Sequence, residues 1–418
     1  MKNYTITNRI TVIDALRGFA LLGIIINHST QEFLAGPTPP SNPTFNIFSP
    51  ADALFGQIMG YLTLGKFFTI FSFLFGLSFA IQMDSAAKDG RPFAGRMLWR
   101  ILILFAIGFI HSMFYSGDIL RIYAFLGIFL LLMRNLNNGV ILILGLLLVL
   151  NTPLFFVRIQ SQFAPPPTAQ QIEMGKKQGE GFVKMANDQF KIKQNGTLAE
   201  VVKMNFEEGL LGTLGFQLFT GRLFITLGLF LLGLWAGRRQ IFIENLGNKH
   251  FFQRLRIWSG VMALISTLIV IFLGGIVMGP PIPGWRGMIS ATAFDIHQIT
   301  LSVFYISIIT LIYWKTQPIF LRLLVSVGRM GLTTYLCGTA FGALIFFGYG
   351  LGLIGHIGVT ASVISGVIFF ALQIPFSNWW LSKYQFGPVE WLWRSLTFMK
   401  TQAWKQPESS KLSWQNFK

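Results

Sequence analysis

Long apolar runs, separated by short polar or charged stretches, cover most of this chain. Most runs reach the roughly 20 residues that a helix needs to cross a hydrocarbon layer of about 30 Å. Because they are apolar on nearly every side, length identifies them better than helical periodicity does. The pattern predicts ten membrane-spanning helices, near residues 12–34, 54–82, 98–115, 118–134, 138–157, 216–237, 257–279, 291–314, 331–349 and 357–381.

Two of these spans are predicted to be composite. Glycines and a lysine interrupt the second span between Gly60 and Lys66, and an amphipathic stretch at 318–327 precedes Gly328-Arg329-Met330-Gly331. Broken helices inside membranes often line cavities. Glycines also let helices pack closely, so the sequence leaves both interpretations open.

One loop is much longer than the others. Residues 158–215 begin with a triple proline and continue polar. We expect either a helix over 168–190 that serves as a lid, or a partly disordered linker. The chain therefore divides into membrane helices in 1–157, an extracytoplasmic loop at 158–215, further helices of the same membrane domain in 216–400, and a cytoplasmic tail at 401–418.

Composition supports a membrane fold. Hydrophobic residues make up 53% of the 418 residues and charged residues only 12%, whereas soluble domains carry about 25% charge. We therefore predict an all-α, polytopic membrane helix bundle of about ten helices. The single cysteine, Cys337, excludes an intrachain disulfide.

The charge distribution gives the orientation. Lys and Arg gather in alternate short loops and in the C-terminal region, whereas the loops at 35–53 and 349–356 contain neither. By the positive-inside rule, both termini are cytoplasmic. The net charge of +17 therefore reflects loops that face anionic lipid, and it does not indicate a nucleic-acid partner.

The first span carries unusual polar residues. Arg17 and His28 are eleven residues apart, close to three helical turns, so they share one face about 16 Å apart. Asp14 precedes Arg17 by three residues and can pair with it. Titratable groups inside lipid are costly and usually functional, but an interfacial ion pair and a solvated histidine remain alternatives.

Further titratable residues are predicted at the outer membrane face. His111, Asp118 and Arg121 flank a tight turn between the third and fourth spans, and Asp295 and His297 open the eighth. Asp118 also suits a helix cap, which is compatible with a functional role. We expect two or more histidines to converge on one polar pocket.

Cofactor motifs are few. The chain has no helical His-x-x-x-His or Glu-x-x-His pattern and no cysteine pair, so no metal is expected. It also lacks a Walker-type glycine loop, which argues against ATP-driven work.

Several further segments form recognisable motifs: Asp14-x-x-Arg17-Gly18 with Asn27, the Phe-rich run Phe67–Gly76, Gly108–His111, Gly117–Leu120, Gly328–Leu336 and Gly387–Arg394. Together they resemble, almost from end to end, an uncharacterised bacterial inner-membrane family typified by YeiB. The first-span pattern also resembles that of heparan-alpha-glucosaminide N-acetyltransferases and of acyltransferases that O-acetylate surface polysaccharides.

The resemblance implies a multi-pass protein of the bacterial inner membrane that transfers an acyl group. The donor would be cytoplasmic acyl-CoA, such as acetyl-CoA, and the acceptor a periplasmic or outer-leaflet sugar or lipid. His111 or His28 would act as general base, Asn27 would bind the oxyanion and Asp118 would orient the imidazole. Substrate-binding roles would fall to Arg17, Asp14, Lys66, Arg121, Asp295, His297 and Arg329, with Arg17, Lys66 and Arg329 lining the inner half of a channel.

Two other functions use the same residues. A transporter or flippase for a small anionic or lipidic solute would need the polar pocket and the composite spans without covalent chemistry. A non-catalytic membrane module is the third hypothesis. The sequence is compatible with a homodimer and names no protein partner; membrane lipid is the one partner that it requires.

Overall fold

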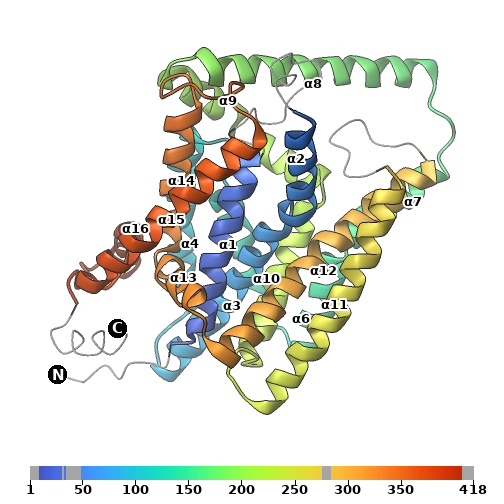
Figure 1. The fold of residues 1–418 in the computed structure, drawn as a ribbon. Coiled ribbons are helices and arrows are strands. Elements are labelled where there is room, and N and C mark those ends of the chain that lie inside the picture. The colour runs from blue at the N-terminus through green and yellow to red at the C-terminus, as the bar shows by residue number, and fades with distance from the viewer. Residues whose placement is uncertain (1–8, 31–32, 34–48, 275–283, 407–418) are drawn as a thin grey trace.

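The computed structural model describes residues 9–30, 33, 49–274 and 284–406, and within them every regular element is a helix (Figure 1). The predicted all-α membrane fold is therefore confirmed. Residues 407–418 of the predicted tail lie outside the described residues. The helices are α1 (Thr11–Thr30), α2 (Pro50–Thr63), α3 (Lys66–Lys88), α4 (Ala94–Phe114), α5 (Leu120–Met133), α6 (Asn138–Val149), α7 (Thr152–Gln162), α8 (Ala169–Asn195), α9 (Leu198–Phe219), α10 (Arg222–Arg238), α11 (Leu246–Phe272), α12 (Gly284–Thr316), α13 (Ile319–Arg329), α14 (Gly331–Phe346), α15 (Val359–Lys383) and α16 (Pro388–Phe398).

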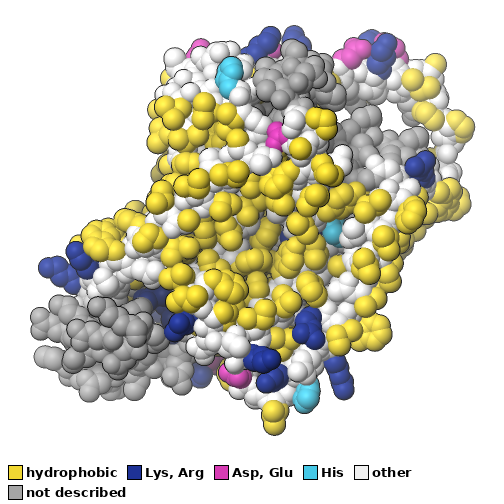
Figure 2. All heavy atoms as spheres, in the orientation of Figure 1, with side chains coloured by type: hydrophobic (Ala, Val, Ile, Leu, Met, Phe, Trp, Pro, Cys, Tyr) yellow, Lys and Arg dark blue, Asp and Glu magenta, His cyan; other side chains and the backbone are white. Residues whose placement is uncertain are grey.

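The helices account for the predicted spans in three ways. Six helices or continuous helix pairs in the described residues are long and apolar enough to cross a membrane. Three more spans arise if the bent pairs α6–α7, α9–α10 and α13–α14 each cross as one unit. The tenth predicted span is α5, which has only 14 residues. Figure 2 shows the resulting belt of hydrophobic side chains, with Lys and Arg gathered toward both ends.

Helix α1 lies in the centre of the bundle, where glycines allow it to approach α13 closely. A Cβ atom on Gly18 would lie 2.2 Å from the carbonyl oxygen of Leu324, and one on Gly328 would lie 1.9 Å from that of Asp14. Since no larger residue fits at either position, the two backbones touch. This contact brings Arg329, which follows Gly328, to the level of Asp14 and Arg17.

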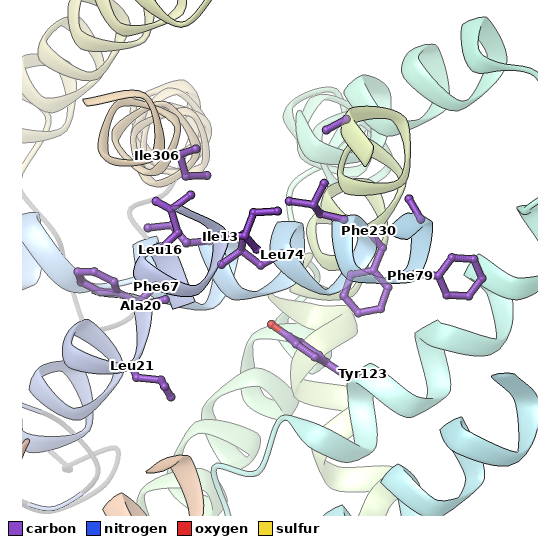
Figure 3. Close-up of a cluster of buried hydrophobic side chains, with 14 of the residues drawn as sticks. Ile13, Leu16, Ala20, Leu21, Phe67, Leu74, Phe79, Tyr123, Phe230 and Ile306 are labelled. Carbon is purple, nitrogen blue, oxygen red and sulfur yellow. The ribbon is translucent and has the colours of Figure 1, made fainter. Parts of the chain in front are cut away.

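A hydrophobic core surrounds α1 and continues to α3, α5, α10 and α12. Figure 3 shows Leu16, Leu74 and Phe230 within it. The ring of Phe75 stacks on Phe230 with centroids 4.5 Å apart. This core fixes α3 against α10, so the cavity described below has a rigid wall on that side.

Both predicted composite spans are broken. Gly65 separates α2 from α3 with φ +82°, a conformation that glycine adopts without steric cost, and α13 meets α14 at 88°. The α2–α3 pair still forms one span of 39 residues, whereas α9 and α10 also meet at a sharp bend, of 81°, with Gly221 in the same left-handed region as Gly65. The sequence analysis missed that bend because residues 198–215 were assigned to the long loop.

The long loop of residues 158–215 is largely helical. Helix α8 begins with a capping box, in which Thr168 and Gln171 each bond the backbone N–H of the other. In Figure 1, α8 lies across the end of the bundle opposite α16. The positive-inside rule predicts that this end is extracytoplasmic, and the two ends of the bundle are named cytoplasmic and extracytoplasmic below according to that prediction.

Candidate functional site

A large cavity of about 1850 Å³ runs through the membrane domain. Its lining begins at Arg9, Arg17 and Arg394 on the cytoplasmic side and continues to Gln189 and Lys193 of α8 on the opposite side. Apolar side chains, mostly aromatic, line the middle. The cavity thus joins two polar ends across an apolar section; that section includes Phe67, Phe68, Phe71, Leu74, Phe75, Leu104, Leu120 and Tyr123.

The cytoplasmic end of the cavity is strongly basic. Five arginines line it, from α4, α13 and α16 and from the chain around α1, whereas the only carboxylate in this part of the described lining is that of Glu390. Such an excess of guanidinium groups favours an anionic ligand, because arginine recognises phosphate and carboxylate with paired donors. The arginines are Arg9, Arg17, Arg100, Arg329 and Arg394.

Asp14 holds two of these arginines in place. Its carboxylate is 3% exposed and accepts hydrogen bonds from Arg9 and from Arg17, whose Nη1 lies 2.7 Å from Oδ1. The other guanidinium nitrogen of Arg17 donates to the hydroxyl of Ser78. The expected Asp14–Arg17 pair therefore exists, and it orients a guanidinium that lines the cavity.

Two arginines rest on aromatic rings instead of carboxylates. The Arg100 guanidinium lies 3.8 Å from the ring centroid of Trp393, whose indole N–H donates to the Arg100 carbonyl oxygen. The guanidinium of Arg394 lies 4.7 Å from the ring of Phe386. Burial and the nearby charge of Arg9 lower the pKa of Arg394. Since neither guanidinium pairs with a described carboxylate, both have capacity to bind an anion.

Glu390 joins α16 to the first turn of α14. The backbone N–H groups of Leu332 and Thr333 donate to its Oε1 at 2.6 and 2.9 Å, and the Thr333 hydroxyl donates to Oε2 at 2.6 Å. A carboxylate at a helix N-terminus satisfies donors that have no partner within the helix. Burial raises the pKa of Glu390, although these hydrogen bonds act in the opposite direction.

Replacing Glu390 with Gln is expected to lower the stability of the protein by about 1 kcal/mol, because the charge-assisted hydrogen bonds to the start of α14 weaken. Thermal unfolding of the purified protein in detergent measures the change. Glu244→Gln serves as the control, since Glu244 is exposed. Equal melting temperatures for the two variants would contradict the role assigned to Glu390.

The extracytoplasmic half of the cavity contains the expected histidine cluster. His28 and Asn27 of α1 both line the cavity, and the Asn27 Oδ1 atom is buried without a hydrogen-bond partner among the described residues. The His28 ring lies 5.1 Å from that of Tyr115 and 6.4 Å from that of Tyr335. His111 contacts the same two rings, at 5.8 and 5.2 Å. The structure therefore brings His28 and His111 together around two tyrosines.

His111 belongs to a buried hydrogen-bonded group. Its Nδ1 lies 2.8 Å from Oδ1 of Asp118, and its Nε2 has no hydrogen-bond partner in the part of the chain that the structure describes. Asp118 also accepts a hydrogen bond from the backbone N–H of Arg121 at 3.0 Å. The carboxylate therefore both stabilises the start of α5 and orients the imidazole. Arg121 lies behind Asp118 and donates to the Thr213 hydroxyl. His28 and Asp118 line the cavity, whereas His111 lies outside the lining and bonds Asp118.

Six of the predicted site residues do not line the cavity. Asp14, His111 and Arg121 bond residues that do, whereas Asp295 and His297 have their partners elsewhere. Lys66 was expected in the inner half of the channel, but it lies fully buried at the α2–α3 break, where its amine donates to the Leu64 carbonyl oxygen at 2.8 Å. Asp295 accepts from Asn151 at 3.0 Å and from Arg158 at 2.8 Å. His297 bonds Thr267 and the Tyr61 carbonyl oxygen.

These contacts have a common physical cause. Each side chain is inside the bundle, where polar groups need hydrogen-bond partners. Asp295 and His297 bond distant segments, whereas Lys66 bonds the carbonyl two residues before it. His356, the remaining histidine of the outer side, is exposed in the loop before α15. Within the described ranges, no group of three or more His, Cys, Asp and Glu side chains is arranged to hold a metal ion.

Sequence reasoning did not single out four lining residues: Arg100, Trp393, Arg394 and Tyr335. The two arginines were counted as loop charges in the orientation argument. A sequence signal was present for three of them, because Trp393 and Arg394 close the segment Gly387–Arg394 and Tyr335 lies in Gly328–Leu336, both of which carried the family resemblance.

Comparison with known proteins gives consistent similarities. Residues 236–400 match the family described as "Protein of unknown function (DUF418)". The chain is 28% identical to the uncharacterized protein YxaH of Bacillus subtilis, with 95% of this chain and 96% of that protein covered. It is 29% identical to an uncharacterized 39.9 kDa protein of Bacillus acidopullulyticus over 95% and 96% of the two chains. The uncharacterized protein YeiB of Escherichia coli is 26% identical over 93% and 96%.

Proposed function

We propose that this chain, a member of the YeiB-like family and a multi-pass membrane protein, transfers an acyl group from cytoplasmic acyl-CoA to an extracytoplasmic acceptor. One observation carries the proposal: a single cavity joins a cluster of arginines at one end to His28 at the other, where His28 and His111 contact the same tyrosine ring. The relatives named above are bacterial, and we propose that the protein lies in the bacterial inner membrane, where a cytoplasmic donor could reach it.

The cytoplasmic end suits the nucleotide part of the donor. Phosphates need cations, and Arg17, Arg100 and Arg394 present guanidinium groups to the cavity. Beyond them the lining becomes apolar, which suits a slender pantetheine arm that carries the thioester toward His28. Along α1, the distance from Arg17 to His28 is about 16 Å. Thus the donor would enter from the cytoplasm and present its acyl carbon in the outer half.

The histidine end supplies the chemistry of acyl transfer. His28 takes the proton from an acceptor hydroxyl or amine while that oxygen or nitrogen attacks the thioester carbonyl. The amide of Asn27 donates a hydrogen bond to the developing oxyanion. When the carbon–sulfur bond breaks, the protonated imidazole returns the proton to the leaving CoA sulfur. The products are the acylated acceptor and free CoA thiol.

His111 and Asp118 complete the proposed site. Asp118 fixes the tautomer and orientation of His111, because its carboxylate accepts the Nδ1–H. His111 then lies beside Tyr115 and Tyr335, the two rings that also flank His28. His111 is accordingly a positioning residue in this proposal, and His28 is the base that touches the acceptor.

The test is calorimetric titration of acetyl-CoA into the purified protein in phosphatidylcholine nanodiscs, with acetyl-pantetheine as the matched ligand without the nucleotide. Saturable binding of acetyl-CoA that is at least tenfold tighter than that of acetyl-pantetheine supports the proposal. If neither acetyl-CoA nor longer acyl-CoAs bind, acyl-CoA is not the donor.

Transport is the second candidate function, and the bent helix pairs favour it. The pairs α9–α10 and α13–α14 bend by 81° and 88°, and both contribute to the cavity lining. Transporters often place such breaks at a central binding site. Flux of a small anion into liposomes by a His28→Ala variant at the wild-type rate would favour transport, because transfer chemistry would then be unnecessary.

A further inference from the structure

We infer that the acceptor is an elongated, hydroxyl-bearing molecule with an anionic group, which lies along the cavity side of α8 with that group at Lys193; the inference rests on the proposed acyl transfer. It assigns a binding site to the extracytoplasmic half of the cavity. The supporting observations concern a buried lysine, two glycines and the position of α8.

Lys193 is an isolated buried cation. Only 4% of the residue is exposed, and it lines the cavity in the last turn of α8. Its amine lies 5.8 Å from the ring centroid of Phe347 and forms no ion pair with a described carboxylate. A buried charge is costly unless it is paired. An anionic ligand group would supply the missing partner.

The other charged groups of this half do not supply that partner. Asp118 is held by His111 and by Arg121. Glu208 lines the cavity from α9 but is exposed to solvent. Arg222 adds a second cation to the lining, with its guanidinium above the rings of Phe68 and Phe216.

The cavity side of α8 has room for a ligand. Gly175 and Gly179 line the cavity, and a Cβ atom built on either would meet no atom of the described residues within 4 Å. Glycine inside a helix costs about 1 kcal/mol relative to alanine, so close helix packing does not explain these two. Open backbone at both positions leaves space for a molecule that lies against the helix.

The remaining lining residues of α8 fit a sugar-like molecule. Gln178 and Gln189 offer amide groups to hydroxyls, and Phe182 offers a ring face. Lining positions extend from Gly175 to Lys193, about 27 Å along the helix axis. This length exceeds a single sugar ring, and therefore an elongated acceptor fits better than a small one.

The C-terminal end of α8, which contains Phe190 and Lys193, lies near His28 and His111. Phe190 packs in one hydrophobic cluster with Phe33, Tyr115 and Phe346, and Tyr115 contacts both His28 and His111. The backbone N–H of Gly348 also donates to the Lys193 carbonyl oxygen at 2.8 Å. An anion at Lys193 would thus hold a neighbouring hydroxyl near the proposed base.

The experiment measures binding of four probes to the full-length protein in phosphatidylcholine nanodiscs. Maltotetraose phosphate and maltotetraose form one pair, and dihexanoyl phosphatidylglycerol and dihexanoyl phosphatidylcholine form the other. We expect the anionic member of one pair to bind about tenfold or more tightly than its neutral partner, and the pair that shows this effect identifies a glycan or a lipid source.

Matched variants assign the effect to α8. Lys193→Gln is expected to remove the preference for the anionic probe, whereas Lys193→Arg and the exposed control Lys191→Gln keep it. Gly179→Leu is expected to block the probe, while Gly181→Leu, also in open space but outside the lining, does not. Acetyl-CoA is titrated into each variant to confirm folding and to test the donor end separately.

The outcomes separate the two proposals. If acetyl-CoA binds the wild type and Lys193→Gln equally, but no probe prefers its anionic form, the acceptor site is wrong and the donor site stands. If Lys193→Gln still prefers the anionic probe, the proposed acceptor site is also wrong. Absence of acetyl-CoA binding would count against acyl transfer, whatever the probes do.

Discussion

His28→Ala is expected to lower acyl-transfer turnover by about 10²- to 10⁴-fold, the usual contribution of a positioned general base. His28 is the histidine that lines the cavity in its outer half, between Tyr115 and Tyr335. Its loss removes proton transfer but leaves the arginine end unchanged, so acetyl-CoA affinity should stay within about twofold. Release of CoA thiol in the presence of acceptor measures turnover, and calorimetry measures affinity.

Two further variants test the division of roles between the histidines. His111→Ala should also lower turnover, but Asp118→Asn should shift the pH profile as well, because it changes the group that fixes the His111 tautomer. His356→Ala is the matched control, since His356 is exposed in a loop outside the cavity lining. Full turnover in both His28→Ala and His111→Ala would show that the catalytic assignment is wrong.

The membrane fold could be predicted because its main signal is one-dimensional. The length of an apolar run decides whether a helix can cross the hydrocarbon layer, and positive loops decide its direction. Gly65 and Gly331 also identified two breaks correctly, because glycine weakens a helix locally. The bend at Gly221 was missed since it joins an amphipathic segment of the long loop to an apolar span.

Residues that line the cavity could be predicted together only where they lie on one face of a single helix. Arg17 and His28 share a face of α1, so their alignment follows from helical periodicity. The partners of Asp295 are decided by packing between distant segments, since Asn151 and Arg158 precede it by 144 and 137 residues. For Lys66 the deciding neighbour was its own broken helix end, at the Leu64 carbonyl.

At the basic end of the cavity, the sequence failed to predict residues that do belong to the site. Arg100 and Arg394 are almost 300 residues apart, and only the packing of α16 against α4 makes them part of one site. In sequence each resembles an ordinary cytoplasmic charge. Trp393 gives Arg100 its special role, because a guanidinium stacked on an indole is held in place without a carboxylate.

Arg100→Gln combined with Arg394→Gln is expected to weaken acetyl-CoA binding by about 10²-fold or more, since a hydrogen bond to a charged group contributes about 1.5–3 kcal/mol. Both guanidinium groups lack a described carboxylate partner, so under the proposed function they would bind the phosphates of the donor. Affinity for acetyl-pantetheine, which lacks the nucleotide, should not change. Calorimetry at two salt concentrations measures both ligands, and the salt dependence should decrease in the variant.

The matched control for this double variant is Arg254→Gln. Arg254 is an exposed arginine at the cytoplasmic end of α11 and lies outside the cavity lining. Its removal changes the net charge on the same side of the membrane without changing the site. If Arg254→Gln weakened acetyl-CoA binding as much as the double variant does, general attraction between a basic surface and an anionic ligand would explain the affinity. If only the double variant does so, the contact is local, and the junction of α4 and α16 is where the nucleotide binds.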